Sequence, residues 1–217
     1  MKRRDFSMRL AGSGLGLAWA GTALAQGAVP VEGQQFVRLS SPARVTLPSP
    51  DKKIEVVEFF WYGCGHCYAF EPAVEAWAKR LPADVAFRQV PVGFAAPHQL
   101  HQKLFYALEE MGQLATINKR VFAAIHQQNR RLSSEAEIVA FATSNGLDGA
   151  KFADAFKSFG VNTKAIRAKQ LAEEYKIDGV PALGVNGRFY TSGSLAGSNE
   201  RALVVADFLI QRSRSGA

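Results

Sequence analysis

Cys64 and Cys67 are the only cysteines among the 217 residues of this chain, and two residues separate them. A pair this close can form a disulfide only where the backbone bends as in the first turn of a helix, so the pair constrains the structure around it. The run Ile54–Phe60 before the pair reads as a strand, and residues 68–80 after it follow a helical pattern. A strand, a close cysteine pair and a helix form the arrangement of a dithiol redox site.

Residues 1–25 have the pattern of an export signal. A basic start at residues 2–4 precedes a weakly apolar stretch, and small residues lead up to Ala25, after which we expect cleavage. A membrane anchor is the alternative, but glycines interrupt the stretch, which is shorter than the ~18 to 20 apolar residues of a spanning helix. Arg3-Arg4 also resembles a twin-arginine signal, so the route of export stays open.

The charge and the length of the exported part limit which classes of protein it can belong to. Removing residues 1–25, which carry a net charge of +3, lowers the formal charge from +7 to +4. The remaining charges are spread along the chain rather than gathered in a basic stripe, which argues against nucleic-acid binding. About 190 residues remain, enough to bury a core without structural disulfides.

The hydrophobic pattern predicts a mixed sheet. Ile54–Phe60 is almost continuously apolar, as in a central strand covered on both faces, and residues 84–92 alternate as a second, parallel strand. An edge strand is expected around residues 35–39. Asn186-Gly187 predicts a hairpin turn; the strands it would join are Ala182–Val185 and Phe189–Ser192.

A block of helices interrupts this sheet. From residue 97 to residue 176 the period of the apolar residues is helical, so we divide the exported chain at these points into residues 26–96, 97–176 and 177–217. Ser134 and Glu137 form a capping-box pattern, and Asp148 is placed to cap another helix.

Two helix boundaries near the end of the chain are less sharply marked. Asn162 or Thr163 is the expected start of the last helix of the block. A closing helix is expected over residues 198–211, followed by a frayed tail, residues 212–217.

The two cysteines are expected to have different roles. Cys64 falls at the helix start, where the helix dipole, unpaired backbone N–H groups and a protonated His66 would favour its thiolate. Cys67 lies one turn further in, so we expect it to resolve the mixed disulfide that Cys64 forms with a substrate. Stabilising the thiolate stabilises the reduced form and makes the disulfide more oxidising, and Gly65 and His66 fit that direction.

A metal site is the main alternative use of the pair. Zinc would need two further ligands, and the chain offers only its four histidines, of which His98 and His101 lie three apart on one expected helix. No second Cys-x-x-Cys pattern accompanies them. We therefore expect no metal and no other cofactor.

Four motifs in this order resemble the DsbA family of exported thiol:disulfide oxidoreductases over nearly the whole mature chain. They are Val57–Phe60, Cys64–Cys67, the helical insertion and Gly179–Ala182. The resemblance implies an α/β, thioredoxin-like fold with an inserted all-helical domain, a cis peptide bond before Pro181, and a substrate loop in which the backbone of Val180 pairs with an extended peptide.

The same resemblance implies a periplasmic protein that oxidises newly exported proteins through Cys64 and Cys67. A DsbB-like membrane quinone reductase would reoxidise the pair. It also implies that Glu58, an acid on an otherwise apolar strand, is buried near Cys67 and relays its proton. From the residues alone, Glu58 could instead be an exposed acid at the strand end, and Arg88 on the neighbouring strand is a candidate partner.

Gly65 differs from the motif of many DsbA proteins, which have proline at this position. Cys-Gly-His-Cys resembles the eukaryotic protein disulfide isomerases, which bears on how oxidising the pair is. Residues 26–53 are too few for the dimerisation domain of DsbC-like isomerases, so we expect a monomer.

Three functions follow from these observations. A dithiol oxidase fits best; a reductase or isomerase would use the same pair, and a non-catalytic metal carrier would combine the cysteines with a histidine. Trp61 and Tyr62 are expected near the site because they adjoin it in the chain, and Phe94 is a further candidate for an apolar groove.

Overall fold

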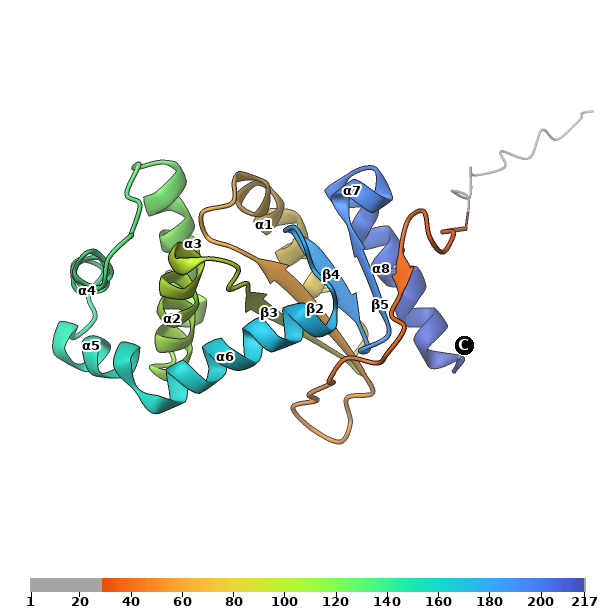
Figure 1. Ribbon diagram of the computed structural model, residues 1–217, viewed down its shortest axis with the longest axis horizontal. Coiled ribbons are helices and arrows are strands. Elements are labelled where there is room, and N and C mark those ends of the chain that lie inside the picture. Colours follow the sequence, from red (N-terminus) through yellow and green to blue (C-terminus); the bar gives the residue numbers. More distant parts are fainter. Residues whose placement is uncertain (1–28, 217) are drawn as a thin grey trace, which may run out of the picture.

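A five-stranded mixed sheet forms the centre of the computed structural model, which describes residues 29–216 (Figure 1). The predicted export signal lies outside these residues. In chain order the strands are β1 (Val37–Arg38), β2 (Ile54–Phe60), β3 (Val85–Pro91), β4 (Ala182–Val185) and β5 (Phe189–Ser192). Across the sheet their order is β1-β5-β4-β2-β3; β2 and β3 are parallel, and the other neighbours are antiparallel. The predicted strands, the parallel pair and the hairpin are confirmed.

Helices cover both faces of this sheet and extend beyond one end of it (Figure 1). They are α1 (Gly65–Ala78), α2 (Ala96–Glu110), α3 (Leu114–His126), α4 (Glu135–Ser144), α5 (Gly149–Lys157), α6 (Phe159–Glu174), α7 (Gly193–Ala196) and α8 (Asn199–Arg214). Helices α2 to α6 lie between β3 and β4 in the chain and form a block beside the sheet, from which α6 runs back across it. The division into domains at residues 97 and 176 stays a prediction.

Strand β2 is the centre of the core because all seven of its residues are buried. Val57 and Phe59 belong to the cluster that joins the sheet to the helical block. Ile54 and Val56 belong to a second cluster, which packs against α1 and α8. Each such side chain contributes about 1.5–3 kcal/mol when it is fully buried, so β2 ties both layers together.

The hairpin turn between β4 and β5 needs residues that tolerate a left-handed backbone, and Asn186 and Gly187 supply them. Asn186 and Gly187 both have positive φ, 51° and 65°, as a two-residue type I′ turn demands. A Cβ on Gly187 would also lie 2.4 Å from the carbonyl oxygen of Ala43. The Gly187 N–H donates to the Tyr175 hydroxyl at 2.8 Å, which fastens the turn to the end of α6.

The last helix of the block begins earlier than predicted. Helix α6 starts at Phe159, not at Asn162 or Thr163, because the Ser158 hydroxyl caps it by accepting the N–H of Val161 at 3.1 Å. Ser158 also ends α5, so one residue separates two helices and no polar linker marks the boundary.

The C-terminal end also differs from expectation. Helix α8 continues to Arg214, so the frayed tail predicted from residue 212 is wrong. The Arg214 guanidinium pairs with the Asp84 carboxylate, with N–O contacts of 2.5 and 3.0 Å, and holds the last turn against the start of β3. The four-residue helix α7 was not predicted.

The capping predictions hold in part. The Ser134 hydroxyl accepts the N–H of Glu137, and Asp148 accepts the N–H groups of Ala150 and Lys151, as predicted. The Glu137 carboxylate, however, accepts the N–H of Ser133 rather than that of Ser134, so the capping box is incomplete.

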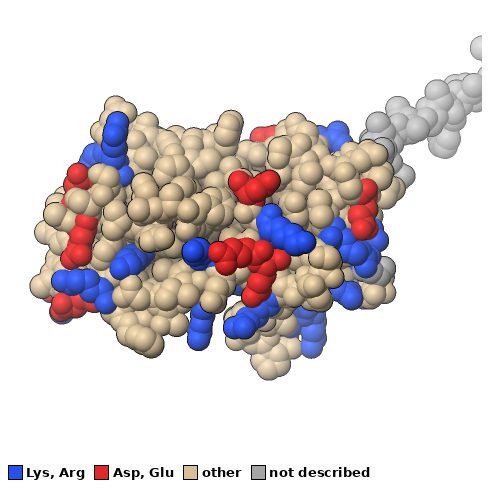
Figure 2. Space-filling model, viewed as in Figure 1, with Lys and Arg blue, Asp and Glu red and all other residues tan. Residues whose placement is uncertain are grey.

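Charges of both signs are interspersed on the face shown in Figure 2. Within residues 29–216, none of the helices has the length and apolarity that crossing a membrane would require.

The two acids of β2 point to opposite faces of the sheet, and their partners differ accordingly. Glu55 is fully buried, and its carboxylate accepts from Arg88 at 2.8 Å and from the N–H of Thr46 at 3.1 Å. Arg88 is therefore the partner of Glu55, and its suggested pairing with Glu58 is wrong. In the observed register Arg88 lies beside Val57, on the face that Val57 shares with Glu55.

We expect Arg88→Met to lower the free energy of unfolding by about 3 kcal/mol, because it leaves the buried Glu55 carboxylate without its cationic partner. Chemical denaturation at neutral pH measures the change. The double variant Glu55→Leu/Arg88→Met should recover much of the loss, since no buried charge remains. The exposed Lys151→Met serves as a control, and a loss below about 1 kcal/mol for Arg88→Met would contradict this role of the pair.

Candidate active site

Cys64 is the N-cap residue of α1, in extended conformation (φ −86°, ψ 116°). Its sulfur accepts the backbone N–H of Cys67 at 3.4 Å, which is the capping bond of the helix. Both cysteines are free thiols in the structure; Cys64 is partly exposed, whereas Cys67 is 1% exposed. Gly65 and His66 between them are exposed. The arrangement gives an incoming thiol access to Cys64 and little access to Cys67.

The surroundings separate the acidities of the two thiols. Hydrogen bonds from the Cys67 side chain and from the N–H groups of Cys67 and His66, with the charge of His66, lower the pKa of Cys64 to about 6. Burial opposes this shift without cancelling it. The pKa of Cys67 is raised far above its usual value, first by the hydrogen bond with Cys64 and then by burial. Cys64 is therefore the thiolate at neutral pH.

The loop before β4 adjoins the thiolate position. The Val180–Pro181 peptide bond is cis, which confirms the expectation for Pro181. The Cys64 sulfur lies 3.5 Å from the carbonyl oxygen of Val180, to which it donates when it is protonated. Phe59 of β2 pairs with Ala182 of β4, and this antiparallel register brings the end of β2 next to the residues that precede β4.

Glu58 is 1% exposed, which excludes the alternative of an exposed acid at the strand end. It pairs in register with Gln89, whose side-chain amide donates to the Glu58 carboxyl at 2.8 Å. Burial, followed by the charge of Glu71, raises the pKa of Glu58 to about 8. The Glu58 charge in turn adds to the raised pKa of Cys67, so the two groups interact across the interior.

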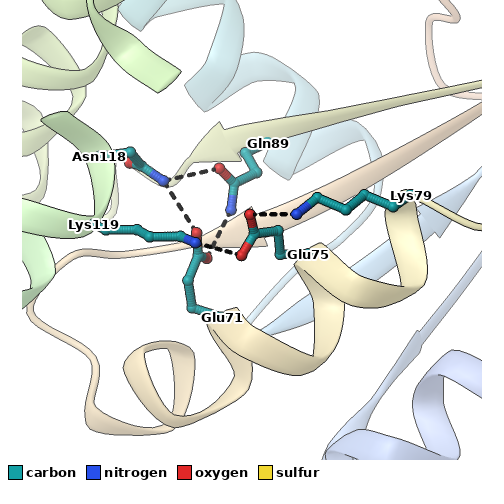
Figure 3. A network of polar contacts seen from close by, with 6 residues as sticks. All are labelled: Glu71, Glu75, Lys79, Gln89, Asn118 and Lys119. Atoms are coloured by element: carbon teal, nitrogen blue, oxygen red, sulfur yellow. Dashed lines mark hydrogen bonds and ion pairs between the residues drawn. The ribbon is translucent and has the colours of Figure 1, made fainter. Parts of the chain in front are cut away.

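A polar network leads outward from Gln89, the hydrogen-bond partner of Glu58, and Figure 3 draws it from Gln89 onward. Gln89 also donates to Glu71 of α1 at 3.0 Å, and the Asn118 amide of α3 donates to Glu71 at 3.2 Å and to Gln89 at 3.3 Å. Burial raises the pKa of Glu71. Nearer the surface than Glu71, the Glu75 carboxylate forms ion pairs with the ammonium groups of Lys119 and Lys79, at 2.6 and 3.0 Å.

Sequence reasoning missed Glu71, Gln89 and Asn118. They come from α1, β3 and α3, and no local pattern relates them. A cavity of about 500 Å³ adjoins the network; its lining includes Glu71, Glu75, Lys79 and Gln89. Glu58 therefore lies at the inner end of a hydrogen-bonded network whose members Gln89 and Glu71 line this cavity.

The aromatic residues near the cysteines divide into core and surface. Tyr62 is fully buried, and its hydroxyl donates to Asn118 at 2.5 Å, so it supports the network rather than lining a groove. The Trp61 ring lies against the His98 ring, with centroids 4.3 Å apart and the planes tilted by 46°. It also covers Gly63, where a Cβ would lie 2.4 Å from the ring. Phe94 is 47% exposed and packs on His98 at 5.8 Å.

The histidines considered as metal ligands make other contacts. His101 lies 3.3 and 3.2 Å from the carbonyl oxygens of Arg131 and Leu132, and His98 accepts the N–H of Ala95 at 3.0 Å. In the described residues 29–216, no three His, Cys, Asp or Glu side chains are grouped so that they could hold a metal ion.

Comparison with known proteins places this site in a family. Residues 98–201 match the model of the DSBA-like thioredoxin domain. The chain is 41% identical over 185 residues to the thiol:disulfide interchange protein DsbA of Pseudomonas aeruginosa, an alignment that covers 85% of this chain and 86% of that protein. The chain belongs to the DsbA family. Its members are thiol:disulfide oxidoreductases with a thioredoxin-like fold, and this chain shares both the fold and the enzyme class.

Other DsbA proteins extend the similarity. DsbA of Bordetella parapertussis is 43% identical over 216 residues, which covers 99% of this chain and all of that protein. The crystal structure of Pseudomonas aeruginosa DsbA superposes with a TM-score of 0.80 at 40% identity, over 86% of this chain and 96% of that one. The DsbA resemblance predicted from four motifs is confirmed.

We expect Glu58→Gln to change how stability depends on pH. The Glu58 pKa rises from 4.5 to about 8 on folding, so the wild type loses stability as the pH rises from about 4.5 to 8. The variant lacks this loss. It should be more stable than the wild type above pH 8 by on the order of 4 kcal/mol, and similar to it below pH 4.5.

Denaturant unfolding between pH 4 and pH 9 measures the difference. The exposed Glu173→Gln is the matched control and should follow the wild-type curve. A stability difference between Glu58→Gln and wild type that does not change with pH would show that Glu58 titrates normally.

We expect the absorbance of the Cys64 thiolate near 240 nm to titrate with a midpoint near pH 6 in the reduced protein. Cys67→Ala should move this midpoint upward, because it removes the hydrogen bond that contributes most to the low pKa. Cys64→Ala is the control and should show no step between pH 4 and pH 8. An unchanged midpoint in Cys67→Ala would assign the shift to the backbone N–H groups and the charge of His66.

Proposed function

We propose that this protein is a periplasmic dithiol oxidase, which donates the Cys64–Cys67 disulfide to newly exported proteins. The carrying observation is the stabilised thiolate of Cys64. A group that stabilises the thiolate favours the reduced protein, so the oxidised protein gives up its disulfide more readily. Names of the relatives, which are thiol:disulfide interchange proteins, support the same chemistry.

The size of this effect can be bounded. Lowering the Cys64 pKa from 9 to about 6 raises the reduction potential of the pair by up to about 30 mV at pH 7. This is an upper bound because solvent screens the half-exposed sulfur. The thiolate environment therefore shifts the potential toward oxidation of the substrate, and further differences between the two redox states must supply the rest of the shift.

The reaction proceeds in two exchanges. A substrate thiolate attacks the Cys64 sulfur of the oxidised protein, the Cys64–Cys67 bond breaks, and Cys67 leaves as a thiolate. Its pKa lies far above neutral, so it takes up a proton, which the neutral Glu58 acid supplies. A second substrate thiolate then attacks the substrate sulfur of the mixed disulfide, and Cys64 leaves as its stable thiolate. The substrate loses two electrons, and the protein gains them.

Reoxidation removes these two electrons and the one proton that Cys67 took up, because Cys64 is already a thiolate. We infer that a DsbB-like membrane quinone reductase accepts the electrons. Glu58 would recover its proton from the side of the cavity that Glu71 and Gln89 line, since the Gln89 amide holds the Glu58 and Glu71 carboxyl groups close together. The segment 1–25 would direct export, and Val180 and Pro181 would hold the substrate backbone beside Cys64.

Equilibration with glutathione buffers tests the direction of the reaction. We expect a potential for the Cys64/Cys67 pair that is more oxidising than about −200 mV, so that the pair is reduced by the glutathione pool. A potential near −270 mV would identify a reductase instead. In the same assay Cys64→Ala should form no mixed disulfide, whereas Cys67→Ala should accumulate one at Cys64.

A further inference from the structure

A cavity of about 410 Å³ adjoins Cys64 on the side of the loop before β4. Its near wall consists of His66 and the loop with Val180 and Pro181, and the Val180 carbonyl oxygen lies 3.5 Å from the Cys64 sulfur. The far wall is formed by Tyr190 and Ser192 of β5 and by residues of α7 and the start of α8. Val180 therefore belongs to the cavity wall and also contacts Cys64, so the cavity lies next to the reactive sulfur.

The lining of this cavity mixes apolar and polar residues and carries one acidic side chain, Asp178. Asp178 is exposed, and no ion pair or hydrogen bond of its carboxylate is found among residues 29–216. Its charge is close enough to Tyr190 to raise the pKa of that hydroxyl further, after the effect of burial. The opposite wall presents hydroxyl groups, with the Ser192 and Ser194 oxygens 2.8 Å apart. His66 is the only other lining residue that can carry a charge.

Chain geometry directs a substrate residue into this cavity. A substrate cysteine in a mixed disulfide has its sulfur about 2 Å from that of Cys64, and each further residue of an extended peptide advances about 3.3 Å. A peptide that lies along the backbone of Val180 therefore places a side chain one or two residues from its cysteine beside Asp178, two residues before Val180.

We propose that Asp178 is a specificity-determining residue, which favours substrate segments with lysine or arginine one or two residues from the reacting cysteine. The inference rests on the proposed oxidase function. A cationic side chain would enter a cavity with an unpaired carboxylate at one wall and hydroxyl acceptors at the other, whereas an acidic side chain would meet like charge and no basic group other than His66.

Oxidation of matched peptides tests this proposal. Three dithiol peptides that differ only in having Lys, Ala or Glu two residues from the attacking cysteine react with the oxidised protein at low salt, and stopped-flow fluorescence gives the second-order rate constants. We expect the Lys peptide to react roughly two- to five-fold faster than the Ala peptide, the range of a partly exposed ion pair, and the Glu peptide to react most slowly. Added salt should reduce the differences.

Two variants separate the charge of Asp178 from other effects. Asp178→Asn should bring the Lys/Ala rate ratio close to one, and Asp178→Lys should favour the Glu peptide. The matched control is Asp154→Asn, an exposed acid of α5 that does not line the cavity, and it should keep the wild-type ratios. Asp178→Asn has nearly the same shape as the wild type, so it carries the test if Asp178→Lys does not fold.

The outcomes distinguish this inference from the function on which it rests. Equal rates for the three peptides with wild-type protein, or unchanged ratios in Asp178→Asn, would overturn the role of Asp178 while leaving the oxidase function intact. Failure of the wild type to oxidise any of the three peptides would overturn the oxidase function itself.

Discussion

The chemistry of this protein depends on one placement: the sulfur of Cys64 caps the N-terminus of α1, where backbone N–H groups have no partner within the helix. The placement requires two segments that lie far apart in the chain. Cys64 follows the C-terminal end of β2. Because β4 pairs antiparallel with β2, Val180, which is 116 residues later and precedes β4, lies at the same end of the sheet. The register of a buried strand therefore decides which backbone faces the reactive sulfur.

Strand β2 also carries two buried acids in different environments, one with a cationic partner and one without. Glu55 and Glu58 are both buried, but their odd spacing places them on opposite faces. Glu55 meets the guanidinium of Arg88, which balances its charge. Glu58 meets only the neutral amide of Gln89 and the like charge of Glu71, so it holds a proton at neutral pH. A buried acid without a cationic partner costs stability, and under the proposed function this acid supplies the proton that Cys67 takes up.

Elements with a local signal could be predicted from the sequence, whereas those set by pairing could not. A few consecutive residues determine the local structure in three places: the continuous apolar run of β2, the Asn186-Gly187 turn and the cysteine pair. The partner of Glu58 was missed because a shift of one residue in the register of β3 exchanges Arg88 for Gln89. The Glu71 network was missed because Asn118 reaches it from α3, which only tertiary packing brings beside α1. Ser158 was missed as a cap because it ends one helix while it begins the next.

Gly65, which stands where many DsbA proteins have proline, affects the Cys64 thiolate less than that difference suggests. The groups that lower the pKa of Cys64 are the Cys67 thiol, the N–H groups of Cys67 and His66, and the charge of His66; the N–H of Gly65 is not among them. Gly65 is the first residue of α1, where the N–H lacks a helical partner and proline is well tolerated, and a Cβ there would meet nothing within 4 Å. The extended backbone of Cys64 also suits a following proline. Glycine and proline at this position therefore leave the thiolate donors equally intact, so a difference in oxidising strength between them must arise from chain stiffness or from substrate contact rather than from the stabilisation of the thiolate.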